Sequence, residues 1–302
     1  QKTKRAWKSV FLHCKKRKME GIRDTELDAF IVAALKEDIG SGDHTSLACI
    51  PADSVKKAKL LVKDDGVIAG IAFARRVFRL LDPESKFSQL LPDGADVKYG
   101  DIAFEIVANT RVLLQAERLV LNTMQRLSGI ATISSRFATE VEDLPVTILD
   151  TRKTTPLMRF LEKWAVRIGG CDNYRDGLYD WIMIKDNHVD GCGSITRAID
   201  RVHEYMTNNN LQLGITVEVR NLVELHEVLE RGGVSRIMLD NFEIPIMREA
   251  VATIQKKYEV EASGGVNLKT VRKIAETGVD FISVGALTHS AGCLDLSLKI
   301  QK

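Results

Sequence analysis

From residue 146 to the C-terminus, short β-branched apolar runs alternate with amphipathic helical segments. The apolar runs predict six strands, at 146–150, 181–185, 215–219, 236–240, 260–264 and 281–285. Helical patterns separate them, near 157–168, 194–206, 222–231, 245–257 and 268–277. Alternation of this kind indicates parallel βαβ units. Because no GxGxxG follows the first strand and no Walker A sequence occurs, it favours a (β/α) barrel of six or seven strands over a dinucleotide-binding fold.

The region before residue 146 mixes helical and strand patterns. Helices are predicted at 24–39 and 72–81, and strands on both sides of an Asp-Gly turn within 57–71 and again within 90–109. A long helical stretch covers 110–141, with a predicted interruption at Ser128 and Gly129. This region is therefore α+β, and it shows no chemistry of its own.

Composition narrows the class of protein. With 302 residues, 45% of them apolar, the chain is long enough for one large or two unequal domains. No apolar run reaches the length of a membrane span. The five cysteines show neither a CxxC pair nor a zinc-type spacing, which is typical of free thiols in a reducing compartment. We therefore expect a cytoplasmic location and no membrane partner.

The net charge of +2 hides an uneven distribution. Of the 43 basic residues, eight lie within 1–18, which contain no acid, and this leaves 35 basic against 41 acidic residues in the rest. A mildly acidic body argues against a general nucleic-acid surface. Residues 1–18 are expected to be a basic extension ahead of a natural start at Met19; a transit-like leader and a nucleic-acid-binding arm are the alternatives.

Basic side chains follow the first two predicted strands of the barrel. Thr151, Arg152 and Lys153 come directly after the first strand, Lys185 ends the second, and the loop between them carries Arg175. Functional residues of (β/α) barrels lie at the carboxyl ends of strands. Guanidinium groups match carboxylates and phosphates, and ammonium groups add point charges. These residues therefore predict a site for an acidic small molecule, although solvated loop charges are the alternative.

The later strand ends carry a different chemistry. Glu218 and Asp240 follow, and then two glycine-rich turns that are expected to open helices, Ser263-Gly264-Gly265 and Gly285-Ala286. Glycine turns before helices expose backbone N–H groups to a phosphate. A buried Glu218 needs a partner, and Lys185 or Lys153 could supply one. Asp240 could instead cap a turn with Asn241.

An ordered set of motifs resembles the quinolinate phosphoribosyltransferase family, the decarboxylating nicotinate-nucleotide pyrophosphorylases of NAD biosynthesis. The matching segments are GSGDHTS, LNTMQRLSGIAT, DTRKTTP (150–156), LEKWAVRIGG (161–170), NYRDGLYD (173–180), IKDNHV (184–189), VEV (217–219), IMLDN (237–241), EASGGV (261–266) and FISVGALTHS (281–290). The likeness extends from about Ala34 to Ile300, so it covers nearly the whole chain.

The resemblance implies a two-domain α/β fold. An N-terminal open-faced α/β sandwich would occupy 19–127, and an incomplete (β/α) barrel of about seven strands would occupy 128–290. The segment 291–302 is expected to pack with the sandwich. Helical periodicity alone predicts only a salt bridge of Arg118 with Glu117 or another neighbour. The resemblance instead implies a homodimer, or a higher oligomer, in which Arg118 completes the active site of the partner.

The resemblance also implies a reaction and a role for each site residue. Quinolinate and phosphoribosyl pyrophosphate would react, with Mg²⁺, to give nicotinate mononucleotide, pyrophosphate and CO₂. The implied catalytic residues are Lys153, Lys185, Glu218 and Asp240, and the last two would bind Mg²⁺, directly or indirectly. The implied quinolinate ligands are Arg118, Thr151, Arg152, Lys153, Tyr174, Arg175 and Lys185. The implied phosphoribosyl ligands are Glu218, Asp240, Ser263, Gly264, Gly265, Gly285, Ala286 and His289.

The chain departs from the family pattern at three positions. Tyr174 stands where His is usual, Leu157 replaces a glycine, and Arg220 replaces a common acid. Tyrosine can donate a hydrogen bond but cannot be a cation, which puts affinity and pH dependence in question. Two alternatives follow: a related family associated with molybdenum transport genes, and a catalytically idle metabolite-binding protein. An idle protein would be expected to lose Lys153, Glu218 or Asp240, and all three are present.

Overall fold

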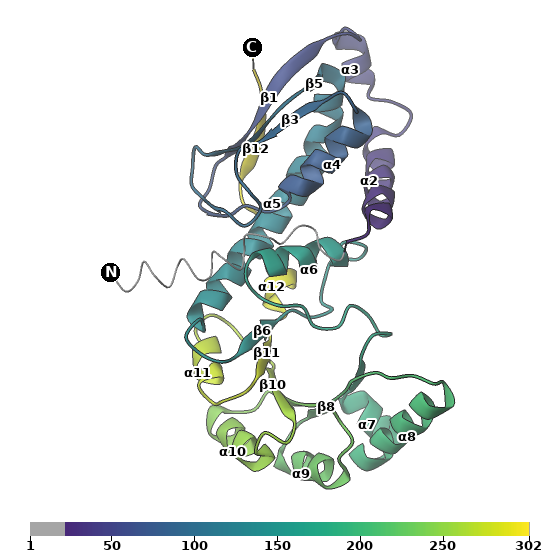
Figure 1. Ribbon diagram of the computed structural model, residues 1–302, viewed down its shortest axis with the longest axis vertical. Helices are drawn as coiled ribbons and strands as arrows, with labels where there is room; N and C mark the ends of the chain where they lie inside the picture. Colours follow the sequence, from purple (N-terminus) through teal and green to yellow (C-terminus); the bar gives the residue numbers. More distant parts are fainter. Residues whose placement is uncertain (1–21, 302) are drawn as a thin grey trace. The chain divides into compact units, whose positions relative to one another are not determined.

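The computed structural model describes residues 22–301, which form two compact units (Figure 1). Of the described residues, the first unit contains 22–135, 155–170 and 291–301, and the second contains 136–154 and 171–290. The predicted basic extension at 1–18 lies outside the described residues. Between residues 22 and 301 no helix combines the length and the apolar composition that crossing a membrane requires.

The first unit is built on an antiparallel sheet with the strand order β12-β1-β5-β3. Its strands are Val55–Val62 (β1), Lys86–Gln89 (β3), Ile102–Asn109 (β5) and Leu296–Ile300 (β12). Helix α4 (Ile71–Leu81) packs Phe78 against Phe104 of β5, with ring centroids 6.3 Å apart. Buried and partly exposed residues alternate along β1, so only one face of the sheet is covered. The unit is therefore the predicted open-faced α/β sandwich.

Both strands predicted about the Asp-Gly turn are present, but two local features of the first unit were not predicted. The strands on either side of the Asp-Gly turn do not pair with each other, because β2 (Gly66–Val67) pairs with β4 (Asp96–Val97) in a separate sheet. The short strand β3 was also missed, since its exposed residues carry no apolar alternation. The predicted helix at 24–39 is confirmed as α2 (Asp24–Ile39), and α3 (His44–Cys49) follows it.

The predicted interruption at Ser128 and Gly129 was wrong, because α5 (Thr110–Glu140) is one continuous helix. The Ser128 hydroxyl is fully buried and bonds the backbone N–H and C=O of Ala69, so it contributes to packing and does not end the helix. A Cβ built at Gly129 would lie 1.8 Å from the carbonyl oxygen of Gly292. Gly129 therefore allows the C-terminal segment to approach the helix closely. Helix α6 (Arg159–Ile168) belongs to the same unit.

All six strands predicted for the second unit are confirmed, and they form one parallel sheet. The strands are Thr147–Leu149 (β6), Ile182–Ile184 (β7), Ile215–Val219 (β8), Arg236–Asp240 (β9), Glu259–Ser263 (β10) and Phe281–Ser283 (β11). Their order is β6-β11-β10-β9-β8-β7, and a parallel bridge from Leu149 to Asp172 adds a seventh position beside β6. The incomplete barrel of about seven strands is therefore confirmed.

Helices connect the strands of this sheet, as its parallel order requires. They are Asp186–Cys192 (α7), Ile195–Asn208 (α8), Leu222–Arg231 (α9), Ile244–Ile254 (α10) and Val271–Ala275 (α11). Ala286–His289 (α12) follows the last strand of this sheet, β11. Figure 1 shows α8, α9 and α10 on the outer side of the sheet. Because every strand has the same direction, all carboxyl ends meet at one edge of the sheet.

We predict that Gly129→Ala lowers the free energy of unfolding of the first unit. The added methyl group would overlap the Gly292 carbonyl, and overpacking of this kind costs about 1–3 kcal/mol. Gly191→Ala in α7 is the matched control, because a Cβ there meets nothing within 4 Å. That variant should be stabilised by about 0.5–1 kcal/mol. Urea denaturation of both variants checks the contrast, and equal stabilities would contradict the packing described.

Candidate active site

Two adjoining cavities open at the carboxyl ends of the parallel strands. The smaller has a volume of about 210 Å³ and the larger about 640 Å³. Five residues line both cavities, namely Thr151, Lys153, Lys185, Ser263 and Ser283. The strand ends singled out in the sequence therefore come together at one place, as a barrel topology predicts.

The smaller cavity is cationic. Arg152, Lys153, Arg175 and Lys185 line it, and none of its ten described lining residues is acidic. The remaining residues are Thr151, Tyr174, Met183, Met238, Ser263 and Ser283. Cations around a cavity that is partly apolar suit a flat molecule that carries negative charge.

Two guanidinium groups of this cavity lie close enough to affect each other. Burial lowers the pKa of Arg175, and the neighbouring Arg152 cation lowers it further. The Nε atom of Arg152 is buried and has no hydrogen-bond partner among the described residues. Arg175 donates one hydrogen bond, from Nη1 to the Trp181 carbonyl, 3.3 Å away. Guanidinium groups that repel each other, and that have N–H groups without acceptors, are expected where an anion binds.

The larger cavity contains the two carboxylates predicted from the strand ends, Glu218 and Asp240. Glu218 is 7% exposed, and its Oε2 atom forms an ion pair with Nζ of Lys185. The predicted partnership of Glu218 with Lys185 is therefore confirmed. Asp240 accepts a 2.8 Å hydrogen bond from Nδ2 of Asn241, so it is held at the strand end but keeps free lone pairs toward the cavity.

Glycine turns line the opposite side of the larger cavity. Gly264 and Gly265 have φ values of 96° and 61°, which favour glycine. The expectation that both turns open helices was half right. Gly285 directly precedes α12, whereas α11 begins only at Val271, because a further turn is inserted after Gly265.

Lys153 and His289 converge near Gly285. A Cβ built at Gly285 would lie 3.0 Å from Nε2 of His289 and 3.1 Å from Cδ of Lys153. The Thr288 hydroxyl donates to the Lys153 carbonyl over 2.9 Å, which fixes the backbone of the lysine. His289 Nδ1 lies 2.6 Å from the Ser290 hydroxyl. Glycine at 285 therefore leaves room for both side chains to reach the cavity.

The loop that carries Tyr174 and Arg175 is tied to the end of β6. Asp150 is fully buried and accepts from the Tyr174 backbone N–H over 2.9 Å and from Nδ2 of Asn173 over 2.6 Å. The Tyr174 hydroxyl bonds Oγ1 of Thr216 at 2.6 Å. Burial raises the pKa of Tyr174, and the Glu261 charge raises it further. The phenol is therefore neutral and firmly placed at the cavity.

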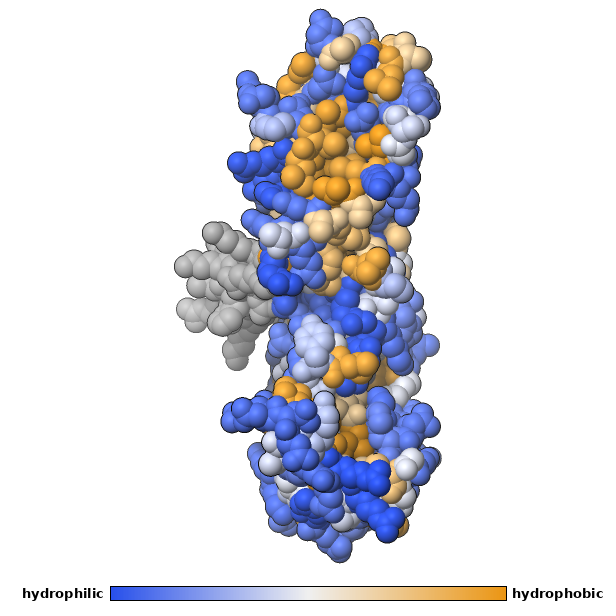
Figure 2. All heavy atoms as spheres, turned by 90° about the vertical axis from the view of Figure 1, so that its right-hand side faces the viewer, coloured by the Kyte–Doolittle hydropathy of each residue, from blue (hydrophilic) through white to orange (hydrophobic). Residues whose placement is uncertain are grey.

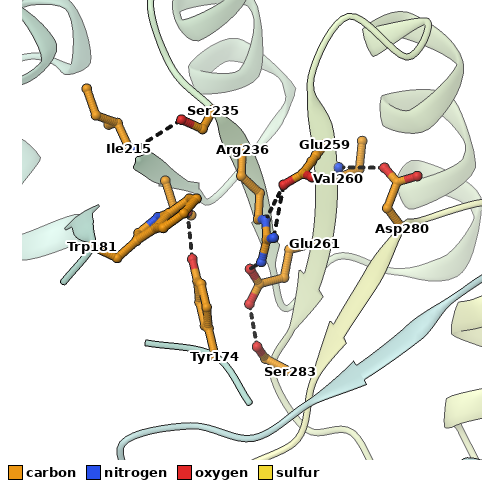
Figure 3. Close-up of polar contacts among 11 residues, drawn as sticks. Tyr174, Trp181, Ile215, Ser235, Arg236, Glu259, Val260, Glu261, Asp280 and Ser283 are labelled. Atoms are coloured by element: carbon orange, nitrogen blue, oxygen red, sulfur yellow. Dashed lines mark hydrogen bonds and ion pairs between the residues drawn. The ribbon is translucent and has the colours of Figure 1, made fainter. Parts of the chain in front are cut away.

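A buried polar cluster below the smaller cavity was missed in the sequence. Figure 3 shows Tyr174, Trp181, Arg236, Glu261 and Ser283 turned toward one another, the first two from the loop before β7 and the others from three strands. Arg236 is 7% exposed and Glu261 is fully buried. The two-residue period of a strand offered a signal for this cluster. Arg236 and Met238 lie on the same face of their strand as Asp240, and Ser283 lies on the same face as Gly285.

Arg118 belongs to the other unit and lies on α5. Its side chain is 68% exposed, and its nearest acid is Glu117, at 4.0 Å. The weak contact predicted from periodicity is therefore present. Of the departures from the family pattern, Arg220 binds Glu224 and Asp190, at 2.6 Å and 3.2 Å, and Leu157 adopts a φ of 63°, a conformation that favours glycine.

Comparisons with known proteins match almost the whole chain to one family. Residues 43–128 match the quinolinate phosphoribosyl transferase N-terminal domain, and residues 130–299 match the C-terminal domain. Quinolinate phosphoribosyltransferase [decarboxylating] 1b of Nicotiana tabacum is 45% identical over 91% of this chain and 83% of its own length. The probable nicotinate-nucleotide pyrophosphorylase [carboxylating] of Synechocystis is 40% identical over 91% and 93%.

Solved structures agree with the sequence relatives. NadC from Streptococcus pyogenes superposes with a TM-score of 0.86 at 36% identity, over 93% of this chain and 99% of its own. Nicotinate-nucleotide pyrophosphorylase from Ehrlichia chaffeensis does so with a TM-score of 0.86 at 37% identity, over 93% and 100%. The chain is therefore a member of the quinolinate phosphoribosyltransferase family.

Proposed function

We propose that this chain transfers the phosphoribosyl group of phosphoribosyl pyrophosphate to quinolinate, with loss of CO₂, in NAD biosynthesis. The products would be nicotinate mononucleotide and pyrophosphate. The observation that supports this best is the pair of adjoining cavities, one lined by four cations and no acid, the other by Glu218, Asp240 and glycine turns. The relatives named above carry this activity in their names.

Quinolinate, a planar dicarboxylate, suits the smaller cavity. Its two carboxylates would bind Arg152, Arg175 and Lys185, and the apolar faces of its ring would contact Met183 and Met238. The unpaired Nε atom of Arg152 would then gain an acceptor. Thr151 and Tyr174 lie in the same lining and would complete the carboxylate contacts.

Phosphoribosyl pyrophosphate suits the larger cavity. Ser263, Gly264, Gly265, Gly285, Ala286 and His289 line one side of it and would hold the 5′-phosphate through hydroxyl, imidazole and backbone N–H groups. Lys153 lines both cavities, so it would neutralise pyrophosphate as it leaves. The quinolinate nitrogen would attack the anomeric carbon, and Glu218 and Asp240 would stabilise the positive charge that develops on the ribose.

Mg²⁺ fits the carboxylates of the larger cavity. Among residues 22–301 no group of three or more His, Cys, Asp and Glu side chains could hold a metal by itself. Mg²⁺ commonly binds through one or two carboxylates together with substrate phosphates, and Glu218 and Asp240 provide that number. We therefore propose that these two residues hold Mg²⁺, directly or through water, where it would neutralise phosphate charge.

Decarboxylation would need no covalent catalysis by the enzyme. Alkylation makes the ring nitrogen cationic, so the ring can accept the electron pair left when the adjacent carboxylate departs as CO₂. None of the four cysteines within the described residues lines either cavity. The chain would accordingly act by positioning the substrates and by stabilising charge.

We further propose a homodimer, or a higher oligomer, in which Arg118 serves the active site of the partner. The exposure of Arg118 and its weak contact with Glu117 support this, because the guanidinium is available to another chain. Figure 2 shows apolar side chains gathered on one face of the first unit, and Val32 and Leu47 of that unit are 60% and 50% exposed. Exposed apolar patches of this kind often mark protein interfaces.

We propose a reducing location such as the cytoplasm, supported by Cys49, Cys192 and Cys293, which form no disulfide. Some relatives are named chloroplastic or mitochondrial, so an organelle is the alternative. An idle binding protein of the same family is the alternative for activity, and it predicts no CO₂ release from quinolinate.

The experiment that tests the reaction is CO₂ release from carboxyl-labelled quinolinate. Release should require both phosphoribosyl pyrophosphate and Mg²⁺, and it should match the nicotinate mononucleotide that is formed. Adding a chelator should stop it. A folded protein that releases no CO₂ under these conditions would contradict the proposed reaction and favour an idle binding protein.

We predict that Lys153→Ala lowers turnover by about 10³-fold or more, because it removes a charge that faces both substrates. Thermal unfolding should be nearly unchanged, since Lys153 is exposed. Lys269→Ala, an exposed lysine that lines neither cavity, is the control and should keep wild-type turnover. Near-wild-type turnover in Lys153→Ala would contradict the role assigned to Lys153.

Mixed dimers test the shared site. Arg118→Ala and Lys185→Ala should each be inactive as homodimers, whereas a mixed dimer has one site in which both residues are present. Random reassociation makes half of the dimers mixed, so about a quarter of wild-type activity should return. Verified mixed dimers without any activity would argue against a site shared between two chains.

A further inference from the structure

The smaller cavity has a floor formed by residues inside the strands. Met183, Met238 and Ser283 lie on β7, β9 and β11, whereas the four cations lie at or beyond the strand ends. Ser283 is 7% exposed and connects this floor to the buried ion pair of Arg236 and Glu261 (Figure 3). The established features of the site leave this buried ion pair without a role.

Both oxygens of Glu261 accept hydrogen bonds. Oε2 accepts from Nη1 of Arg236 over 3.1 Å, and Oε1 accepts from the Ser283 hydroxyl. Arg236 can only donate, because a guanidinium carries no acceptor. It is also fixed from other sides, by Glu259 at 2.9 Å and by the Phe281 ring, 3.8 Å from its central carbon. Burial raises the pKa of Glu261, while the Ser283 hydrogen bond and the Arg236 charge favour its ionised form.

This arrangement determines the direction in which Ser283 points its proton. A serine hydroxyl has one proton and two lone pairs, and Ser283 gives its proton to Glu261. Toward the cavity it can therefore only accept. A carboxylate, which also only accepts, gains nothing from such a floor and is drawn to the cations at the rim.

We propose that Arg236 and Glu261 are positioning residues that keep Ser283 from donating into the cavity, so that a dicarboxylate binds with both carboxylates at the cationic rim. The ring is then held in one orientation, with its nitrogen available to the second substrate. This inference rests on the proposed function. It assigns to the buried ion pair an effect on which orientation quinolinate adopts and not on its affinity in the productive orientation.

Glu261→Gln tests the proposal with little change in shape. A glutamine has one acceptor oxygen, which Arg236 requires, so its amide N–H must face Ser283 and the Ser283 proton must turn into the cavity. A carboxylate could then bind the floor in an unproductive orientation. We expect kcat to fall about tenfold and the Kd of quinolinate, measured by calorimetry without the second substrate, to fall by a similar factor, because the unproductive orientation is an additional bound state.

Two comparisons separate positioning from simple loss of structure. Glu259→Gln removes the other carboxylate partner of Arg236, but that side chain is 49% exposed and lines neither cavity at the strand ends. It should keep kcat within about twofold of wild type. Adding Ser283→Ala to Glu261→Gln removes the misdirected donor, so kcat should rise about fivefold above that of Glu261→Gln alone.

The proposal is overturned if Glu261→Gln has the kcat of Glu259→Gln, or if Ser283→Ala fails to raise kcat in the double variant. A wild-type chain that neither binds nor converts quinolinate would contradict the proposed function as well, and so the two failures are distinguishable.

If Glu261→Gln does not fold, Arg236→Met/Glu261→Gln is used, in which the glutamine oxygen is free to accept from Ser283. Its kcat should exceed that of Arg236→Met/Glu261→Leu about tenfold, and equal values would overturn the proposal.

Discussion

Repulsion among like charges is the constraint on which this site depends. Arg152, Lys153, Arg175 and Lys185 surround a cavity of about 210 Å³, and only Lys185 has a carboxylate partner there, Glu218. Such charges stay together only where the backbone holds them. The parallel sheet does so, because every strand delivers its end to the same edge, and Asp150 fixes the loop that brings Arg175. An anionic substrate would turn this repulsion into attraction.

A second electrostatic device lies inside the barrel. Ion pairs buried away from water rarely add stability relative to apolar residues of the same size. In the buried ion pair of Arg236 and Glu261, the guanidinium also contacts the rings of Tyr174, Trp181 and Phe281. A guanidinium with so many partners is better explained by the specificity of the site than by the stability of the fold. Control of one hydroxyl proton at the cavity floor is a role that an apolar pair could not fill.

Much of this architecture follows from the sequence. The strand ends identified Lys185, Glu218 and Asp240, because the two-residue period and parallel order place them at one edge without knowledge of packing. The cluster around Arg236 and Glu261 did not follow, since it depends on which strands are neighbours. The continuous helix through Gly129 was missed because the glycine looked like a helix break. The reason for a glycine there is the approach of the C-terminal segment, which is remote in sequence. A role for Arg118 in a second chain cannot be read from helical periodicity.

The most direct test of the account is the position of quinolinate in a crystal structure of its complex with this protein. The account predicts the dicarboxylate in the smaller cavity, with both carboxylates on Arg152, Arg175 and Lys185 and the ring nitrogen toward the larger cavity. Ser283 should make no hydrogen bond to either carboxylate. Quinolinate bound away from the carboxyl ends of the strands, or held through Ser283, would contradict it.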